Sequence, residues 1–198
     1  MYQRKVKLII GIVSFVFFSI SIYSQTNSLE NYKGTWDFKA SESKVTFKIG
    51  NLFIFNVKGE MPLKDGHLIN TNDQFEVNVV IDPASLETGI NKRDEHLKSE
   101  DFFYVEQYPI IEFTGNKVSL NDIEKKDKYT YRTKGKLSIR GITKEEDVYF
   151  NIEQINQTGI LITGESKINR LDYNVDYDSA GMGDEAKVKF EVKAQIKK

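Results

Sequence analysis

Cysteine is absent from the 198-residue sequence, and histidine occurs only twice, at His67 and His96. The lack of cysteine excludes disulfide bridges, thiol catalysis, covalent haem attachment and a lipid-modified N-terminal cysteine. Metal sites need three or four ligands at suitable spacing, and most of these are histidine or cysteine. The sequence therefore predicts no metal and no cofactor. We expect His67 at the surface and His96 in a capping or packing role.

An excess of positive charge is absent as well. The chain has 28 basic and 29 acidic residues, and no basic stripe is interleaved with aromatic residues. This balance argues against nucleic acid as a partner. A Gly-x-Ser-x-Gly elbow and a phosphate-cradling glycine loop are also missing. We therefore assign no catalytic residue and expect a protein that is not an enzyme.

The N-terminal segment has the pattern of a secretory signal peptide. Arg4, Lys5 and Lys7 precede an uncharged, mostly apolar run over residues 8–22, and small or polar residues follow directly. A helix of that length spans about 22 Å, less than the roughly 30 Å hydrocarbon core of a bilayer. We expect cleavage near Ser24 and a periplasmic or secreted product. A retained membrane anchor stays open as the alternative, because no A-x-A pattern is present.

Apolar and polar residues alternate along most of the remaining chain, which is typical of strands with one buried face. We expect residues 1–24 to be the signal peptide, 25–33 a linker and 34–198 one domain. Turns are expected at 64–66 and at Gly141. Strands are predicted over 44–50, 52–62, 73–82, 110–119, 129–140, 145–156, 158–169 and 185–197, with a shorter one within 170–177.

Charged residues on one side of nearly every strand place that side in water and favour antiparallel pairing. Eight long strands with one wet face must bury the other face. They do so in a closed barrel or in a two-sheet sandwich, and periodicity alone does not choose between the two. The fold class is therefore all-β and antiparallel.

One segment without alternation, residues 91–99, predicts a short helix between two strands. Asn91 is the expected N-cap, and Asp94 is an acidic residue that suits the first turn of a helix. This helix and the loop that follows it would cover one end of a barrel as a lid. The residues expected at this lid and mouth are Arg93, Asp94, His96, Phe102 and Phe103.

Several residues predicted to face inward are small, which favours an internal pocket. An eight-stranded barrel is just wide enough either to fill itself with side chains or to hold a small ligand. The alternative is that the glycines mark bulges and bends needed for strand curvature. The expected lining of an apolar, aromatic-walled cavity is Phe53, Phe55, Phe113, Gly115, Tyr131, Thr133, Gly135, Phe150 and Gly164.

Several ordered motifs closely resemble the YceI-like family. They are IDPASLETG at 81–89, RDEHL at 93–97, SEDFF at 99–103 and GKLSIRGITK at 135–144, and Trp36 and Gly59 fit as well. The resemblance covers residues 34–197, although the segment 173–183 follows the family pattern only loosely.

This resemblance implies an extended, lipocalin-like barrel of eight antiparallel strands, whose cavity in characterised relatives takes a polyisoprenoid or similar long-chain lipid. A polar head group would then lie at the mouth. There Lys92, Arg93 and the N-terminus of the helix would attract an anion.

Three functions stay open. The first is a carrier, store or scavenger of an isoprenoid or other apolar lipid, acting alone or as a homodimer. The second is an enzyme that acts on such a lipid through Arg93, Asp94 or His96. The third is an interaction domain with a filled barrel. An interior free of ionisable groups would favour the first over the second, and bulky residues beside Gly135 and Gly164 would favour the third.

Overall fold

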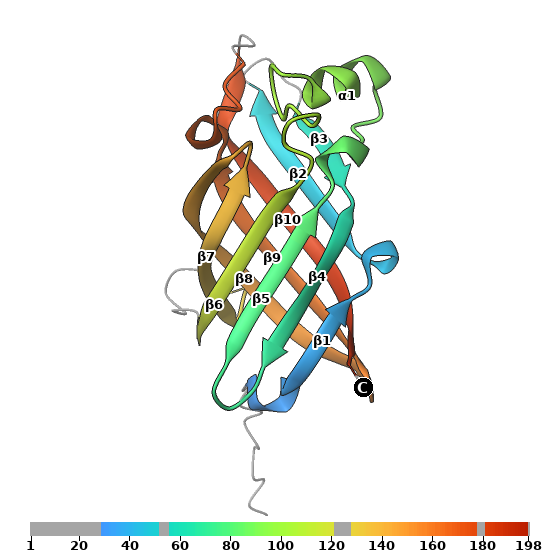
Figure 1. The fold of residues 1–198 in the computed structure, drawn as a ribbon, viewed down its shortest axis with the longest axis vertical. Helices are drawn as coiled ribbons and strands as arrows, with labels where there is room; N and C mark the ends of the chain where they lie inside the picture. Colours follow the sequence, from blue (N-terminus) through green and yellow to red (C-terminus); the bar gives the residue numbers. More distant parts are fainter. Residues whose placement is uncertain (1–28, 52–55, 121–127, 178–180, 198) are drawn as a thin grey trace, which may run out of the picture.

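A single antiparallel sheet forms the body of the molecule (Figure 1). The computed structural model describes residues 29–51, 56–120, 128–177 and 181–197. The strands are β1 (Gly34–Phe38), β2 (Lys44–Asn51), β3 (Val57–Met61), β4 (Leu63–Asn70), β5 (Phe75–Ile81), β6 (Ile111–Leu120), β7 (Tyr131–Ile139), β8 (Ile142–Asn156), β9 (Gly159–Asn169) and β10 (Met182–Ile196). The helices are η1 (Leu29–Tyr32), η2 (Ala40–Glu42), η3 (Pro83–Ser85), α1 (Asn91–Lys98) and η4 (Arg170–Tyr173).

The sheet closes on itself as a barrel of eight long strands. β1 and β2 are two parts of one strand interrupted by η2, and β3 and β4 are two parts of one strand interrupted at Pro62. Each long strand pairs with the next one along the chain, and β10 pairs back with both β1 and β2. The predicted all-β, eight-stranded antiparallel barrel with one short helix is therefore confirmed.

Two local predictions about strands are wrong. Residues 64–66 do not form a turn but lie within β4, where the pairing with β5 shifts register between Leu63 and Asp65. The turn-forming residues produce a bulge there because Asp65 accepts a hydrogen bond from the N–H of Gly66 at 2.8 Å. The strand expected within 170–177 is η4 instead, and the Asn169 side chain caps its first turn.

The end of the barrel that holds the C-terminus is closed by η1 (Figure 1). Trp36 is buried there and donates its indole N–H to the carbonyl of Tyr32 at 3.0 Å. The Tyr32 hydroxyl donates to the carbonyl of Ile152 at 3.0 Å, and the Asn70 amide donates to the carbonyl of Leu29 at 2.8 Å. Part of the expected linker 25–33 thus packs against the barrel.

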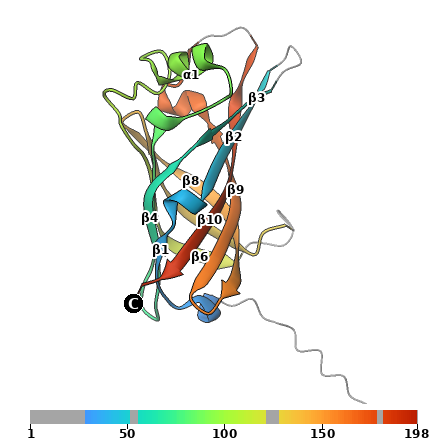
Figure 2. The same cartoon turned by 90° about the vertical axis from the view of Figure 1, so that its right-hand side faces the viewer.

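The opposite end carries α1 and η4 (Figure 2). Leu97 of α1, Phe102 and Tyr173 of η4 are buried in one apolar cluster. A lid over one barrel end was predicted from the sequence, and the segment between β5 and β6 occupies that position. Within the described ranges, no helix has the length and apolar composition needed to span a membrane.

Candidate functional site

A cavity of about 210 Å³ lies inside the barrel, and its wall is apolar except for a few polar side chains, among them Thr133, Glu146 and Ser166. Four lining residues of β5 (Phe75, Val77, Val79 and Ile81) alternate along that strand, yet each is only half-buried. Side chains that point into a closed barrel stay half-buried only where the interior leaves space in front of them. The barrel is therefore not filled by its own side chains.

The cavity reaches both apolar clusters of the core. One cluster, around Trp36 at the η1 end, contributes Leu68 and Phe150 to the wall. The other cluster, at the α1 end, contributes Leu97 and Phe102. The open space therefore extends along the barrel between the two clusters.

Gly135 and Gly164 do not line this cavity, contrary to the sequence-based expectation. A Cβ atom at Gly135 would overlap the ring of Phe113 and lie 2.5 Å from the carbonyl oxygen of Thr114. A Cβ atom at Gly164 would overlap the ring of Phe190. These glycines are small because an aromatic ring from the neighbouring strand lies over each of them.

Gly115 and Tyr131 do not line the cavity either. A Cβ atom at Gly115 would lie 2.8 Å from Thr133 Oγ1, and the pairing of β6 with β7 shifts register directly after this glycine. Gly115 therefore marks a bulge. This agrees with the alternative given in the sequence analysis, that the glycines serve strand curvature. Tyr131 is packed in the core near the η1 end, with its ring 5.4 Å from that of Phe150.

Five of the expected residues do line the cavity: Phe113, Thr133 and Phe150 from the barrel, and Phe102 and Phe103 from the lid. The hydroxyl of Thr133 adds no polar point to the wall, because it donates to the carbonyl of Lys117 at 2.6 Å. Phe53 and Phe55 lie outside the described residues.

Arg93, Asp94 and His96 hold the lid together and do not line the cavity. Asp94 accepts hydrogen bonds from the N–H of Thr88 at 2.9 Å and from the Thr88 hydroxyl, which hold the pKa of this carboxyl below its ordinary value. Arg93 Nε donates to Thr88 Oγ1 at 2.7 Å. His96 Nε2 lies 2.9 Å from Asp101 on the half-exposed side of the lid. Asn91 is the first helical residue and not the N-cap, which is Ile90.

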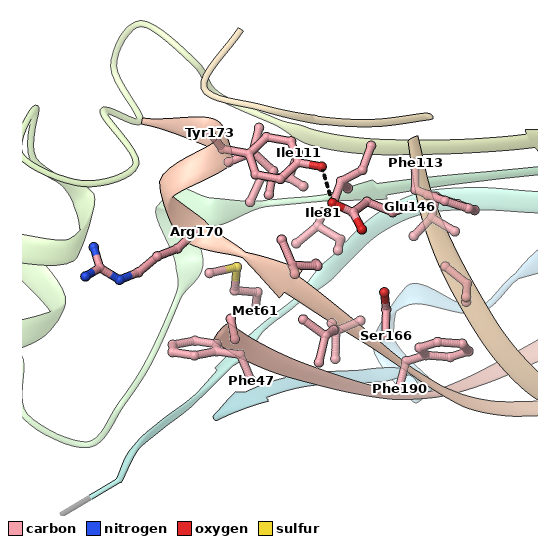
Figure 3. A pocket seen from close by; sticks show the side chains of 18 of the residues that line it. Phe47, Met61, Ile81, Ile111, Phe113, Glu146, Ser166, Arg170, Tyr173 and Phe190 are labelled. Atoms are coloured by element: carbon pink, nitrogen blue, oxygen red, sulfur yellow. Dashed lines mark hydrogen bonds between the residues drawn. The ribbon is translucent and has the colours of Figure 1, made fainter. Parts of the chain in front are cut away.

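Sequence reasoning missed the polar residues of the cavity, Glu146 and Tyr173. The Tyr173 hydroxyl donates to Glu146 Oε1 at 2.8 Å (Figure 3). Burial raises the pKa of Glu146, and burial together with the neighbouring carboxyl raises the pKa of Tyr173. A signal was present in the sequence: Glu146 shares the inward face of β8 with Val148 and Phe150, where an acidic residue breaks the apolar pattern.

Arg170 is the other buried charged residue at the wall, but its guanidinium points away from Glu146 and Tyr173 (Figure 3). Its Nη1 donates to the carbonyl of Val175 at 2.6 Å, and its Nε donates to the carbonyl of Gly183 at 3.0 Å. Arg170 therefore connects the segment after η4 to the start of β10. Of the residues that the structure describes, no three acidic or histidine side chains come together as a metal site.

Fold and cavity together define a class: a closed, lipocalin-like β-barrel with an apolar interior. The family model of the YceI-like domain matches residues 36–194. The chain belongs to the YceI-like family. A UPF0312 protein of Staphylococcus aureus is 32% identical over 174 residues, which cover 80% of this chain and 95% of that protein.

Solved structures share the fold. A polyisoprenoid binding domain from Saccharophagus degradans, 16% identical, has a TM-score of 0.65 and matches 83% of this chain and 100% of its own. Burkholderia cenocepacia BcnA, 21% identical, has a TM-score of 0.67 and matches 80% of this chain and 100% of its own. A Campylobacter jejuni YceI protein, 27% identical, has a TM-score of 0.59 and matches 75% of this chain and 90% of its own.

Proposed function

We propose that this protein is exported and holds a polyisoprenoid or similar long-chain apolar lipid inside its barrel, which it carries, stores or scavenges without chemical change. The observation that supports this most directly is the apolar cavity of about 210 Å³, lined by inward-facing side chains that remain half-buried. The S. degradans relative is described as a polyisoprenoid binding domain, and its fold is similar.

The energetics of such a cavity suit a hydrocarbon chain. Each buried methylene group contributes about 0.8 kcal/mol, so ten of them contribute roughly 8 kcal/mol before the costs of association. An apolar wall needs no ion pair for this affinity. The rings over Gly135 and Gly164 fill part of the barrel, as the interaction-domain hypothesis requires, but the open volume beside them favours a binding function.

Ala186→Leu tests the proposed function. Ala186 lies on β10 and lines the cavity, so a larger side chain would occupy ligand space. Ala84→Leu, on the exposed surface of η3, is the matched control. Both variants and the unaltered protein would be stripped of lipid, offered a prenyl alcohol and examined by native mass spectrometry. We expect Ala186→Leu to melt cooperatively and to lose most of its lipid load. Equal loading of all three proteins would contradict the proposal.

A second candidate function, chemistry on the bound lipid, is favoured by one observation. The interior is not free of ionisable groups, because Glu146 and Tyr173 form a hydrogen-bonded pair at the wall. The recovered lipid would be incubated with the unaltered protein and with the Glu146→Gln variant. A change in the mass of the lipid with the unaltered protein alone would favour this second function over the first.

A further inference from the structure

Glu146 is the acidic side chain on the cavity wall, and its surroundings are apolar. It lies on β8 with Val148 and Phe150 on the same face, and its partner in the pairing with β7 is Gly135. Gly135 has no side chain, and the ring of Phe113 covers it. A carboxyl in such a setting is costly unless hydrogen bonds satisfy its oxygens.

Within the described part of the chain, only one of the two oxygens of this carboxyl accepts a hydrogen bond. Oε1 accepts the hydrogen bond of Tyr173 at 2.8 Å. Among the described residues, every fully buried side-chain oxygen has a hydrogen-bond partner. Oε2 has no partner there, so it is not fully buried. In Figure 3 this second oxygen points away from Tyr173, into the space between the lining side chains.

The charge around Glu146 disfavours a second anion. The hydrogen bond from Tyr173 lowers the pKa of Glu146, whereas the charges of Asp172 and Asp147 raise it and the charge of Lys144 lowers it. The guanidinium of Arg170 donates hydrogen bonds to the backbone carbonyls of Val175 and Gly183. A phosphate or carboxylate beside Glu146 would therefore meet like charge in a medium of low dielectric, where repulsion is strong.

We infer that Glu146, oriented by Tyr173, binds the polar end of the ligand, and that the cavity selects a long-chain lipid with an uncharged hydroxyl head over its phosphate. The hydroxyl of such a lipid donates to Oε2, and its chain lies along the apolar wall. This inference rests on the proposed function. It places the head group inside the barrel, whereas the sequence predicted an anionic head at the mouth beside Lys92 and Arg93.

Three probes with the same chain test the inference: farnesol, farnesyl phosphate and the hydrocarbon farnesane. Binding to the delipidated protein would be measured under mildly alkaline conditions by native mass spectrometry. We expect farnesol to bind about tenfold more tightly than either of the other two, since a hydrogen bond to a charged group has a net value near that ratio.

Two variants separate recognition from folding. Glu146→Gln keeps the size and an acceptor but removes the charge, so the discrimination against farnesyl phosphate should fall to within about threefold. The double variant Glu146→Leu and Tyr173→Phe removes both partners of the hydrogen bond, a change that is often nearly neutral for stability. This double variant should bind farnesane as tightly as farnesol. Glu145→Gln is the matched control, because Glu145 lies on the outer face of β8 and pairs with Lys134 at 2.9 Å.

The outcomes are distinguishable. Equal binding of the three probes by the unaltered protein would overturn this inference and leave the proposed function intact. Binding of none of them would contradict the proposed function itself. A preference for farnesyl phosphate that Lys92→Ala abolishes would overturn the inference in favour of a head group at the mouth.

Discussion

Single residues of the barrel wall show why the small inward positions were misread. Four phenylalanines lie over glycines of neighbouring strands: Phe38 over Gly66, Phe47 over Gly59, Phe113 over Gly135 and Phe190 over Gly164. The sequence shows which face each residue takes, because side chains alternate along a strand. It does not show which residue lies across from a glycine, because that depends on the register of the paired strands, including bulges. The glycines were therefore assigned to the ligand instead of to a ring.

Gly135→Ala should destabilise the barrel. The new methyl group would lie 2.5 Å from the carbonyl oxygen of Thr114, and backbone cannot move aside as a flexible side chain can. Overpacking of this kind costs about 1–3 kcal/mol. Gly50→Ala is the control, because nothing lies within 4 Å of a Cβ atom there. Chemical denaturation would measure both. A Gly135→Ala protein as stable as the control would show that the Phe113 ring does not need this glycine.

Asp94→Asn should destabilise the lid at neutral pH by about 1 kcal/mol, the net value of a typical hydrogen bond. The hydrogen bonds from Thr88 lower the pKa of Asp94 below its ordinary value of 3.8. The ionised carboxylate therefore adds stability above pH 3.8, and this contribution is lost as the pH falls through the lowered pKa. The difference in unfolding free energy between the two proteins should shrink in acid. Asp73→Asn, at an exposed position, is the control, and a pH-independent difference would contradict this account.

At the scale of elements, the β7–β8 turn joins the lid to the barrel. Arg140 and Gly141 both have positive φ, 51° and 75°, as a two-residue hairpin turn requires. The guanidinium of Arg140 donates to the carbonyls of Phe102 at 2.8 Å, Glu100 at 2.6 Å and Asn174 at 2.5 Å. One side chain thus connects the turn, the lid and the segment after η4.

Arg140→Gly should loosen the lid without weakening the turn, because glycine adopts positive φ without strain. We expect faster hydrogen exchange in residues 91–110 and little change in the barrel strands. Arg132→Ala is the control: Arg132 pairs with Asp147 on the outer face, where an exposed ion pair contributes about 0–1 kcal/mol. Unchanged exchange across 91–110 in Arg140→Gly would show that Arg140 does not hold the lid.

Elements with regular alternation were predictable, and irregular ones were not. The strand expected over 145–156 corresponds to β8, and the helix expected over 91–99 corresponds to α1. β1 was missed because its Gly34–Phe38 segment is short and pairs only with distant strands. The role of Arg140 was not predictable either, because its acceptors, in residues 100–102 and at Asn174, lie far from it in the sequence.

For the whole molecule, eight strands with one solvent-facing and one apolar face require a barrel or a sandwich, and the pairing of β10 with β1 and β2 closes the barrel. The position of the open volume was not predictable, because it depends on how rings from facing strands share the interior. The long apolar run at the N-terminus predicts export. The intact mass of the exported protein should therefore lack residues 1–24. A product that retains residues 1–22 would indicate a membrane anchor instead.

The most direct test of the central claim is mass spectrometry of the lipids extracted from folded protein purified from its own compartment. The proposed function predicts one long-chain apolar lipid in stoichiometric amount, and the head-group inference predicts that this lipid is an alcohol. The Ala186→Leu protein, purified in parallel, should carry little of it. A folded protein that carries no lipid, or a lipid load that is unchanged in Ala186→Leu, would contradict the account.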